Sequence, residues 1–193
     1  MIRTKKELQY YLEQDRLAIR RIKDKRPHLL GDEIWKYTRA LRKWEYYAGR
    51  GGLEKILYFY YKYRTHELGL KCGGYSIPMG VFGPGISIAH PGSITVNCSA
   101  RIGKNCRIHE GVCIGVTNGI EQAAHIGDNV FIGSGAKIIG DITIADDVAI
   151  GAGAVVVKSI TEPGTTWAGV PAHKISNNNS HSNISPYLNL DEK

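Results

Sequence analysis

His90 is the residue whose type and position most strongly suggest chemistry. It stands six positions before Val96, which begins a series of Val and Ile residues at every sixth position, so an imidazole occupies a slot that is aliphatic in the later repeats. Because an unperturbed imidazole has a pKa of about 6.5, this ring can accept a proton at neutral pH. Two roles are open from the residues alone: a general base for a hydroxyl, or a structural histidine bonded to a carbonyl.

The repeat that follows His90 predicts the fold. The series holds Val96, Ile102, Ile108, Ile114, Ile120, Ile126, Ile132, Ile138, Ile144, Ile150 and Val156. A period of six fits neither a helix, at about 3.6 residues per turn, nor an alternating strand, at about two. It predicts short strands joined by tight corners, and hence a parallel β-solenoid over about residues 75–170 whose coils are stable only against one another. The polar stretch 117–125 could form one more regular side of the solenoid or an outward loop, and the resemblance described below favours the loop.

The segment that ends at Lys71 differs in composition from the rest of the chain. It holds 18 of the 25 Lys and Arg side chains but 9 of the 18 Asp and Glu side chains, which gives it a net charge of +9. The aromatic and basic run over residues 58–64 suits packing against neighbouring helices or subunits better than peripheral contact with a membrane. No nucleic-acid-binding motif accompanies the basic charge, so nucleic acid is not expected as a partner.

This first segment is expected to be α-helical. Thr4 and Glu7 form the pattern of a capping box, which predicts a helix over residues 4–26. A second helix is expected from the N-cap Asp32 to Tyr47, and a third over residues 53–68. The segment therefore reads as three helices ahead of the solenoid.

Other features limit the class of protein. The four cysteines show no CxxC spacing, which argues against a zinc site or a disulfide framework. No signal peptide and no apolar run long enough to span a membrane is visible, so we expect a cytoplasmic protein. Residues 176–193 are rich in Asn and Ser and are expected to form a flexible tail.

Most of the repeat region resembles the hexapeptide-repeat acyltransferases. Two segments, residues 85–94 (GISIAHPGSI) and 166–174 (TWAGVPAHK), resemble more specifically the serine acetyltransferases and the related acetyltransferases of capsule and exopolysaccharide gene clusters. The resemblance implies a mainly β fold, with a left-handed parallel β-helix over residues 72–175 after an α-helical segment over residues 1–71. It implies acetyl-CoA as co-substrate, no metal, and a homotrimer with active sites between subunits. The N-terminal helices could join two trimers.

The same resemblance gives roles to individual residues. His90 takes the place of the catalytic base, and the amide of Gly92 or Ser93 could stabilise the oxyanion. Where serine acetyltransferases carry an aspartate that orients this histidine, the chain has Tyr75, and the family's second histidine is displaced by two positions to His125. The residues that could orient His90 or line the acceptor site are Tyr75, His109, Glu110, Asn118 and His125. His109 and Glu110 are included because three hexapeptides make one coil, which places both residues about one coil from His90. Alternatively, both side chains lie on a solvated face with no role in the site.

The C-terminal part of the repeat resembles the region that binds coenzyme A in the family. Ser134 and Ala152 are small enough to admit a pantetheine arm, and Lys158 and Lys174 could meet the phosphates as mobile charges. An ordinary surface role remains open for both lysines. The residues expected to meet acetyl-CoA are Ser134, Ala152, Lys158, Gly169, His173 and Lys174.

Three hypotheses for the function follow. The first is an O-acetyltransferase acting on a hydroxyl of a sugar or polysaccharide precursor. It is favoured by the sequence His-Pro-Gly at the histidine and by the shortness of the helical segment before the repeat. The alternative is an L-serine O-acetyltransferase of cysteine biosynthesis. The third is a non-catalytic trimeric scaffold, which would not need the signature of a coenzyme A site.

Overall fold

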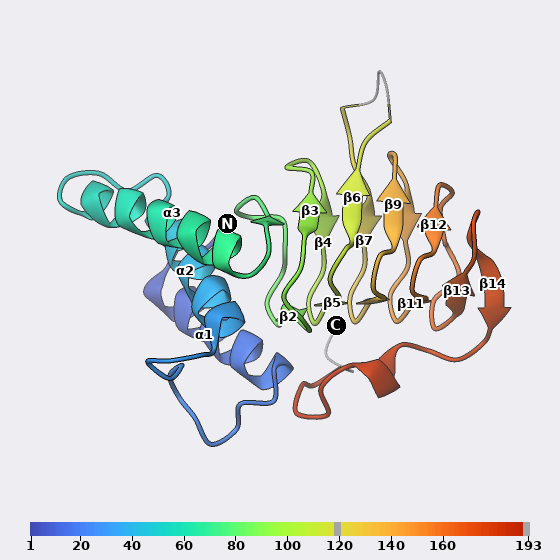
Figure 1. Ribbon diagram of the computed structural model, residues 1–193, viewed down its shortest axis with the longest axis horizontal. Helices are drawn as coiled ribbons and strands as arrows, with labels where there is room; N and C mark the ends of the chain where they lie inside the picture. Colours follow the sequence, from blue (N-terminus) through green and yellow to red (C-terminus); the bar gives the residue numbers. More distant parts are fainter. Residues whose placement is uncertain (118–120, 191–193) are drawn as a thin grey trace.

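A computed structural model describes residues 1–117 and 121–190, so the candidate Asn118 lies outside the described residues. Three helices form one end of the molecule and a prism of short strands forms the other (Figure 1). The helices are α1 (Lys5–Ala18), α2 (Glu33–Tyr47) and α3 (Glu54–Lys71), with a short 3-10 helix η1 (His181–Asn183) near the end. The strands are β1 (Tyr75–Ser76), β2 (Ser87–Ile88), β3 (Ile94–Val96), β4 (Arg101–Ile102), β5 (Arg107–Ile108), β6 (Cys113–Gly115), β7 (His125–Ile126), β8 (Phe131–Ile132), β9 (Lys137–Ile139), β10 (Thr143–Ile144), β11 (Ala149–Ile150), β12 (Val155–Val156), β13 (Thr166–Ala168) and β14 (His173–Ser176).

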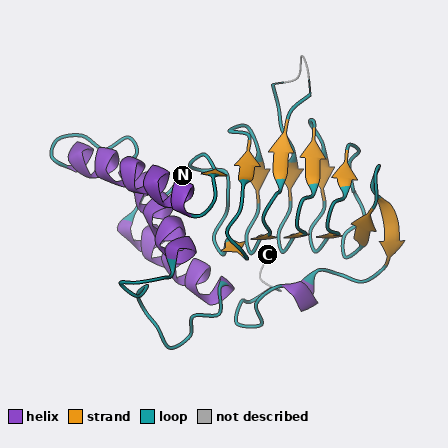
Figure 2. Ribbon diagram, viewed as in Figure 1, coloured by secondary structure: helices purple, strands orange, loops and turns teal. Residues whose placement is uncertain are grey.

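The strands form the three faces of a left-handed parallel β-helix, as the resemblance to the hexapeptide-repeat acyltransferases implies. The sheet orders are β1-β3-β6-β9-β12, then β10-β7-β4, and finally β14-β13-β11-β8-β5-β2. Each coil contributes a strand or an isolated bridge to each face, so neighbours in a sheet come from successive coils (Figure 2). The pairing of β13 with β14 is antiparallel and closes the C-terminal end.

The aliphatic series fills the interior of the prism. Ile108, Ile132 and Ile150 stand over one another in one sheet, and each is 0% exposed. Burying such a side chain contributes about 1.5–3 kcal/mol, which is realised only when the neighbouring coil is present. The six-residue period of the aliphatic side chains therefore results from the stacking of coils.

One row of corners is stabilised by a ladder of polar side chains. Asn105, Asn129 and Asp147 all have positive φ, a conformation that Asn and Asp tolerate better than most residues. The Asn105 Nδ2 donates to Asn129 Oδ1 at 2.8 Å, and Asn129 Nδ2 donates to Asp147 Oδ1 at 2.9 Å. The corners therefore rely on Asn and Asp as well as on glycine.

The expected loop interrupts the coils between β6 and β7. Ile114 pairs with Ile138, a step of four hexapeptides along the chain, whereas Ile138 pairs with Val156, a step of three. The coil before β9 is thus longer by one hexapeptide, and the chain projects from the prism there (Figure 1).

The helical segment differs from the expectation in two places. The capping box of Thr4 and Glu7 is present, but α1 ends at Ala18 rather than near residue 26. Arg20 has a φ of 61°, and the basic run after it places like charges close together on one helical face, which disfavours a continued helix. Asp32 precedes α2 as expected, but its carboxylate accepts from the His28 amide and Arg21 instead of capping the helix.

A buried arginine joins the helices to the first coil. Arg42 of α2 is 0% exposed and donates to the Asp15 carboxylate at 2.8 Å and 3.2 Å. It also donates to Glu45 at 3.2 Å and to the carbonyl oxygens of Phe82 and Gly83 at 2.9 and 2.6 Å. Asp15 and Glu45 raise the pKa of the guanidinium against the effect of burial, so the side chain stays charged. This network fixes where the helices sit on the prism.

The C-terminal segment is packed where the sequence predicts a flexible tail. Ile184 and Leu188 are buried and form a small cluster with Ala18 at the end of α1. The Ser185 hydroxyl donates to the Leu17 carbonyl oxygen at 2.6 Å, and Asn129 donates to the Leu190 carbonyl oxygen at 3.0 Å. A few apolar residues spaced among Asn and Ser are enough to hold residues 176–190 against the prism, which composition alone does not reveal (Figure 1).

Candidate active site

His90 lies at a corner between β2 and β3 and is exposed. The expectation that it occupies an aliphatic slot is wrong, because Ile88 pairs with Ile108 and fills that interior column. The coil from Ile88 to Ile108 is slightly longer than the regular coil of three hexapeptides, and its extra length widens the corner that carries His90. The ring therefore stands outside the core, where a substrate can reach it.

Tyr75 holds the backbone of this corner. Its hydroxyl donates to the His90 carbonyl oxygen at 2.9 Å, and its ring packs edge-on against Tyr37 with centroids 5.1 Å apart. Burial, followed by the nearby Cys72 and Glu110, raises the pKa of Tyr75, so the hydroxyl keeps its proton and remains a donor. Tyr75 thus positions the main chain of His90, whereas no bond joins it to the imidazole.

Only one of the two oxyanion candidates has a free amide. The Gly92 amide donates to the Cys72 carbonyl oxygen at 2.7 Å, so the expectation for Gly92 is wrong in this geometry. Within the described part of the chain, the Ser93 amide has no acceptor. Gly92 is needed for space and conformation instead: its φ is 144°, and an added Cβ would lie 2.7 Å from the Glu110 Cβ. Ser93 is therefore the remaining donor.

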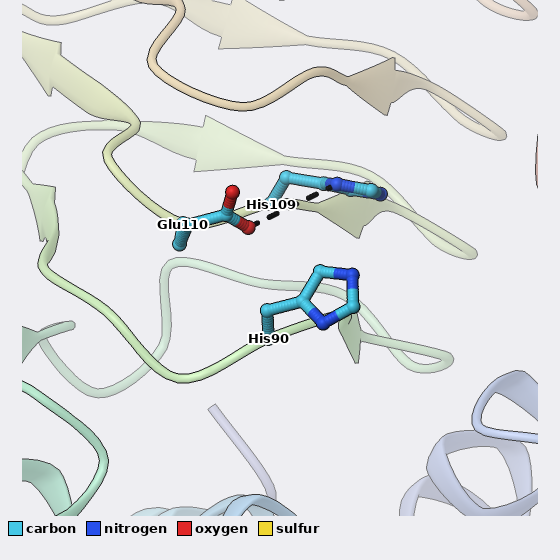
Figure 3. Close-up of side chains that lie close together, drawn as sticks. All are labelled: His90, His109 and Glu110. Atoms are coloured by element: carbon cyan, nitrogen blue, oxygen red, sulfur yellow. Dashed lines mark ion pairs between the residues drawn. The ribbon is translucent and has the colours of Figure 1, made fainter.

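His109 packs directly against His90 (Figure 3). The two rings meet edge to face with centroids 5.6 Å apart, and the other side of His109 meets Phe131 at 5.2 Å. Arg107 donates from Nε to His109 Nε2 at 3.5 Å, which leaves Nδ1 to carry the proton of a neutral ring. Burial and then the charge of Arg107 lower the pKa of His109, so the ring is neutral at pH 7.

We expect His109 to weaken the fold in acid. The folded protein disfavours protonation of this ring, so the unfolded chain takes up more protons below the ordinary pKa of about 6.5. The contribution of His109 to stability is therefore complete above that pH and is lost as the pH falls. The free energy of unfolding in urea should drop more between about pH 7.5 and about pH 5 for the wild type than for His109→Gln. Equal drops would contradict this assignment.

Glu110 completes the cluster. Its Oε1 accepts from the Ser134 hydroxyl at 2.5 Å, while its Oε2 lies 4.0 Å from His109 Nδ1 and has no hydrogen-bond partner within the described residues. The Ser134 hydroxyl, and more weakly the two imidazoles, lower the pKa of Glu110 and keep it ionised. The negative charge beside His90 can stabilise the imidazolium that forms when the base takes up a proton.

A column of corners runs from this cluster towards the C-terminal end. Backbone bonds join Gly111 to Ser93, Gly135 to Glu110 and Gly153 to Ser134, so the corners of four successive coils stack. The stacked residues are Ser93, Glu110, Ser134 and Ala152. The last two were expected to admit a pantetheine arm, and their small side chains leave room along this edge, although Ser134 also holds the Glu110 carboxylate.

The remaining coenzyme A candidates lie in the last coils of the prism, after β12 and around β13 and β14. Gly169 has a φ of 98°, and an added Cβ would lie 3.0 Å from the ring of His173. Lys174 is paired with Glu162 at 2.5 Å, which makes it a poorer phosphate ligand than expected. Lys158 is exposed, has no ion pair within the described residues and lines a cavity of about 200 Å³ beside Trp167.

Comparison with known proteins agrees with the repeat and its corners. Residues 123–158 match the family described as bacterial transferase hexapeptide (six repeats). The chain is a hexapeptide-repeat transferase. Its fold is similar to the crystal structure of Neisseria gonorrhoeae serine acetyltransferase, with a TM-score of 0.67 and 27% identity over 90% of this chain and 68% of that one.

Two further relatives are also serine acetyltransferases. The enzyme of Brucella abortus strain S19, solved in complex with coenzyme A, is 26% identical, with a TM-score of 0.65 over 90% of the transferase and 70% of that chain. A curated serine acetyltransferase of Staphylococcus xylosus is 38% identical over 68 residues. That match covers 34% of the transferase and 32% of the relative, so it spans about a third of the relative's length.

His125 lies apart from the cluster. It belongs to β7, on the sheet β10-β7-β4, whereas His109 follows β5 on another face of the prism. His125 lines a hollow of about 670 Å³ on its own face, and none of the three clustered residues lines that hollow. The hollow that His125 lines is therefore separate from the cluster of His90, His109 and Glu110.

The cluster also has the composition of a metal site. His90, His109 and Glu110 each offer a ligand atom, and these atoms lie within 4.8 Å of one another. Two imidazoles and a carboxylate suit a divalent transition metal, but the Arg107 guanidinium beside His109 opposes a cation there. That the transferase uses no metal stays a prediction.

Sequence reasoning missed the arginines near the site. Arg107 precedes the inward Ile108 in a short strand, so its outward direction beside His109 is readable from the repeat once the site is placed. Arg20 follows α1 and reaches this part of the molecule only through the packing of the helices, for which the sequence carries no local signal.

None of the described helices is long and apolar enough to span a bilayer.

Proposed function

We propose that the transferase is an acetyl-CoA-dependent O-acetyltransferase in which His90 is the general base. The observation that carries the proposal is the exposed imidazole beside Glu110 at the start of a column of small corner residues. The coenzyme A complex of the Brucella abortus relative supports acetyl-CoA as the donor. A scaffold would need neither feature, and absence of acetyl-CoA binding by calorimetry would favour that third hypothesis.

The reaction follows from the residues at the corner. His90 takes the proton of an acceptor hydroxyl as that oxygen attacks the thioester carbonyl of acetyl-CoA. The Ser93 amide donates to the oxyanion of the tetrahedral intermediate. When the carbon–sulfur bond breaks, the imidazolium returns its proton to the thiolate of coenzyme A. Glu110 stabilises the imidazolium between these steps, and Tyr75 holds its backbone.

The relatives change the order of the acceptor hypotheses. All three relatives described above are serine acetyltransferases, so L-serine becomes the first acceptor to test, ahead of the sugar hydroxyl. The sugar hydroxyl remains the second candidate because Tyr75 stands where serine acetyltransferases carry the orienting aspartate and binds only the backbone of His90. A site that orients its base differently can serve another acceptor.

Release of the coenzyme A thiol tests both acceptors. The purified transferase is mixed with acetyl-CoA and either L-serine or a panel of nucleotide sugars and oligosaccharides, and free thiol is followed over time. Turnover with L-serine supports the first acceptor, and turnover with a sugar alone supports the second. No release with any acceptor, at concentrations where acetyl-CoA binds, would refute the proposed activity.

The donor path is tested by filling a corner. Ala152→Trp places a large ring on the column without entering the core, since Ala152 is exposed. We expect the KM for acetyl-CoA to rise by about tenfold or more, the equivalent of about 1.4 kcal/mol of binding free energy, with the melting temperature unchanged. Thr161→Trp, at an exposed position outside the column, serves as the control. Equal KM values for the two variants would place the donor elsewhere.

We also propose a homotrimer with active sites between subunits. The acetyltransferase-like fold supports an oligomer. The exposed Leu53, just before α3, and the exposed Ile56, Phe59 and Tyr63 on α3 support contact of the helices with a second trimer. Light scattering of the full chain distinguishes a monomer, a trimer and a hexamer.

A further inference from the structure

A second hollow lies directly beside the corner of His90. It encloses about 450 Å³, a size typical of pockets for small molecules. One wall is the outer face of β2 and β5, including Ala89 and Pro91 on either side of His90, together with Arg107. The other wall is formed by the chain after α1 and the start of α2. His90, His109 and Glu110 do not themselves line the hollow; it is joined to them by Arg107, which contacts His109, and by the residues on either side of His90.

Two arginines give this hollow an uncompensated positive charge. Arg20 and Arg107 both line it, and neither has an acidic partner within the described residues. Burial, and then the positive charge of Arg20, lower the pKa of Arg107. Such a pair is stabilised when an anion enters between them.

The acidic residues that line the same hollow are already paired with other basic side chains. Asp32 is bound by Arg21 and by the His28 imidazole, the latter at 2.9 Å. Glu33 is paired with Lys36 at 3.8 Å. The carboxylates therefore do not neutralise Arg20 and Arg107.

The end of α1 places Arg20 on one wall of this hollow. Its φ of 61° is the left-handed conformation common just after a helix, and its amide donates to the Leu17 carbonyl oxygen at 3.0 Å.

We propose that this arginine hollow, lined by Arg20 and Arg107, binds an anionic group of the acceptor whose hydroxyl is acetylated at His90. The inference rests on the proposed function and names its substrate class: a hydroxyl compound that carries a carboxylate or a phosphate. Guanidinium groups bind both anions through paired hydrogen bonds. Arg107 Nε lies 3.5 Å from His109 Nε2, and the ring centroids of His109 and His90 are 5.6 Å apart, so the three side chains form a continuous row. The anion and the hydroxyl therefore occupy adjoining parts of one site.

Matched acceptors separate the sources of the anion. Initial rates are measured with L-serine and L-serinamide, with D-glucuronate and D-glucose, and with D-glucose 1-phosphate. Binding of each compound to the whole protein is measured in parallel by saturation-transfer NMR, which does not require turnover. We expect a charged member to bind and react in preference to its neutral partner, and the preferred member identifies a carboxylate or a phosphate.

Substitution of the arginines tests the site itself. Arg107→Gln and Arg20→Gln should each lower kcat/KM for the charged acceptor by about tenfold to a hundredfold, the effect of losing a hydrogen bond to a charged group. The preference over the neutral partner should fall by the same factor, because only the charged compound loses a contact. Arg101→Gln is the control, since Arg101 precedes an inward Ile in β4 as Arg107 does in β5, on another face.

Each outcome has a distinct meaning. Equal losses for charged and neutral acceptors would show that Arg107 only supports His109 and would overturn the proposal. A higher KM for acetyl-CoA with unchanged charge preference would assign the arginines to the donor and would also overturn it. Binding of anions that depends on Arg20 and Arg107 without any acetyl transfer would uphold the site and refute the proposed function.

Discussion

The His90→Ala variant is expected to lose turnover by about 10²–10⁴-fold, the usual contribution of a general base. His90 is exposed at a widened corner, outside the packed interior, so its removal leaves no cavity in the core. The melting temperature and the affinity for acetyl-CoA should therefore stay close to those of the wild type. Steady-state kinetics, thermal unfolding and calorimetry with acetyl-CoA measure these three quantities.

His66→Ala is the control for this prediction, and a near-normal kcat of His90→Ala would contradict it. His66→Ala removes an exposed imidazole from α3 and should keep wild-type turnover. If His90→Ala retained a near-normal kcat, another group would be the base, and His109 would be the next to examine because its ring is in contact. A loss of acetyl-CoA affinity would instead place His90 in donor binding.

The Arg42→Ala variant is expected to lose about 3–5 kcal/mol of folding free energy, the usual result of removing one partner of a buried ion pair. Arg42 is 0% exposed, while Asp15 and Glu45 are 1% and 2% exposed, so neither carboxylate can turn to water when the guanidinium is absent. For a chain of this size the loss corresponds to a fall in melting temperature of roughly 6–20 °C. Thermal unfolding followed by circular dichroism measures it.

Arg39→Ala provides the comparison on the same helix. Arg39 makes no ion pair within the described residues, so its removal should cost less than about 1 kcal/mol. Equal losses for Arg39→Ala and Arg42→Ala would show that the network around Arg42 adds no stability. Because Arg42 also binds the Phe82 and Gly83 carbonyls, we expect its loss to loosen the helices from the first coil before the prism unfolds.

These two predictions separate chemistry from architecture. The proposed catalytic corner depends on a few outward residues at the edge of a regular prism, and the prism should tolerate their replacement. The arginine hollow is different, because Arg20 belongs to the helical segment and Arg107 to the prism. The shape of the hollow therefore depends on the packing of the helices against the first coil, which Arg42 stabilises. When that packing weakens, we expect acceptor binding to be lost before the prism unfolds.

The sequence alone determines the repeat, and with it most of the fold. Branched residues spaced by six can be buried together only in stacked coils, so Ile108, Ile132 and Ile150 predict their own column. The same count of positions per coil places His109 and Glu110 near His90, and the structure brings these three together. Local rules also identify the capping box at Thr4, because its partners lie within one helical turn.

Only the tertiary structure decides the rest, because it depends on contacts that have no local pattern. His90 falls on a multiple of six by coincidence, and the longer coil widens its corner and moves it outside while Ile88 fills the core. The Gly92 amide donates to the carbonyl oxygen of Cys72 at the end of α3, and Asp15 binds Arg42 across a long stretch of sequence. Such long-range pairs are chosen by the packing of the helices on the prism, which also brings Arg20 to the site.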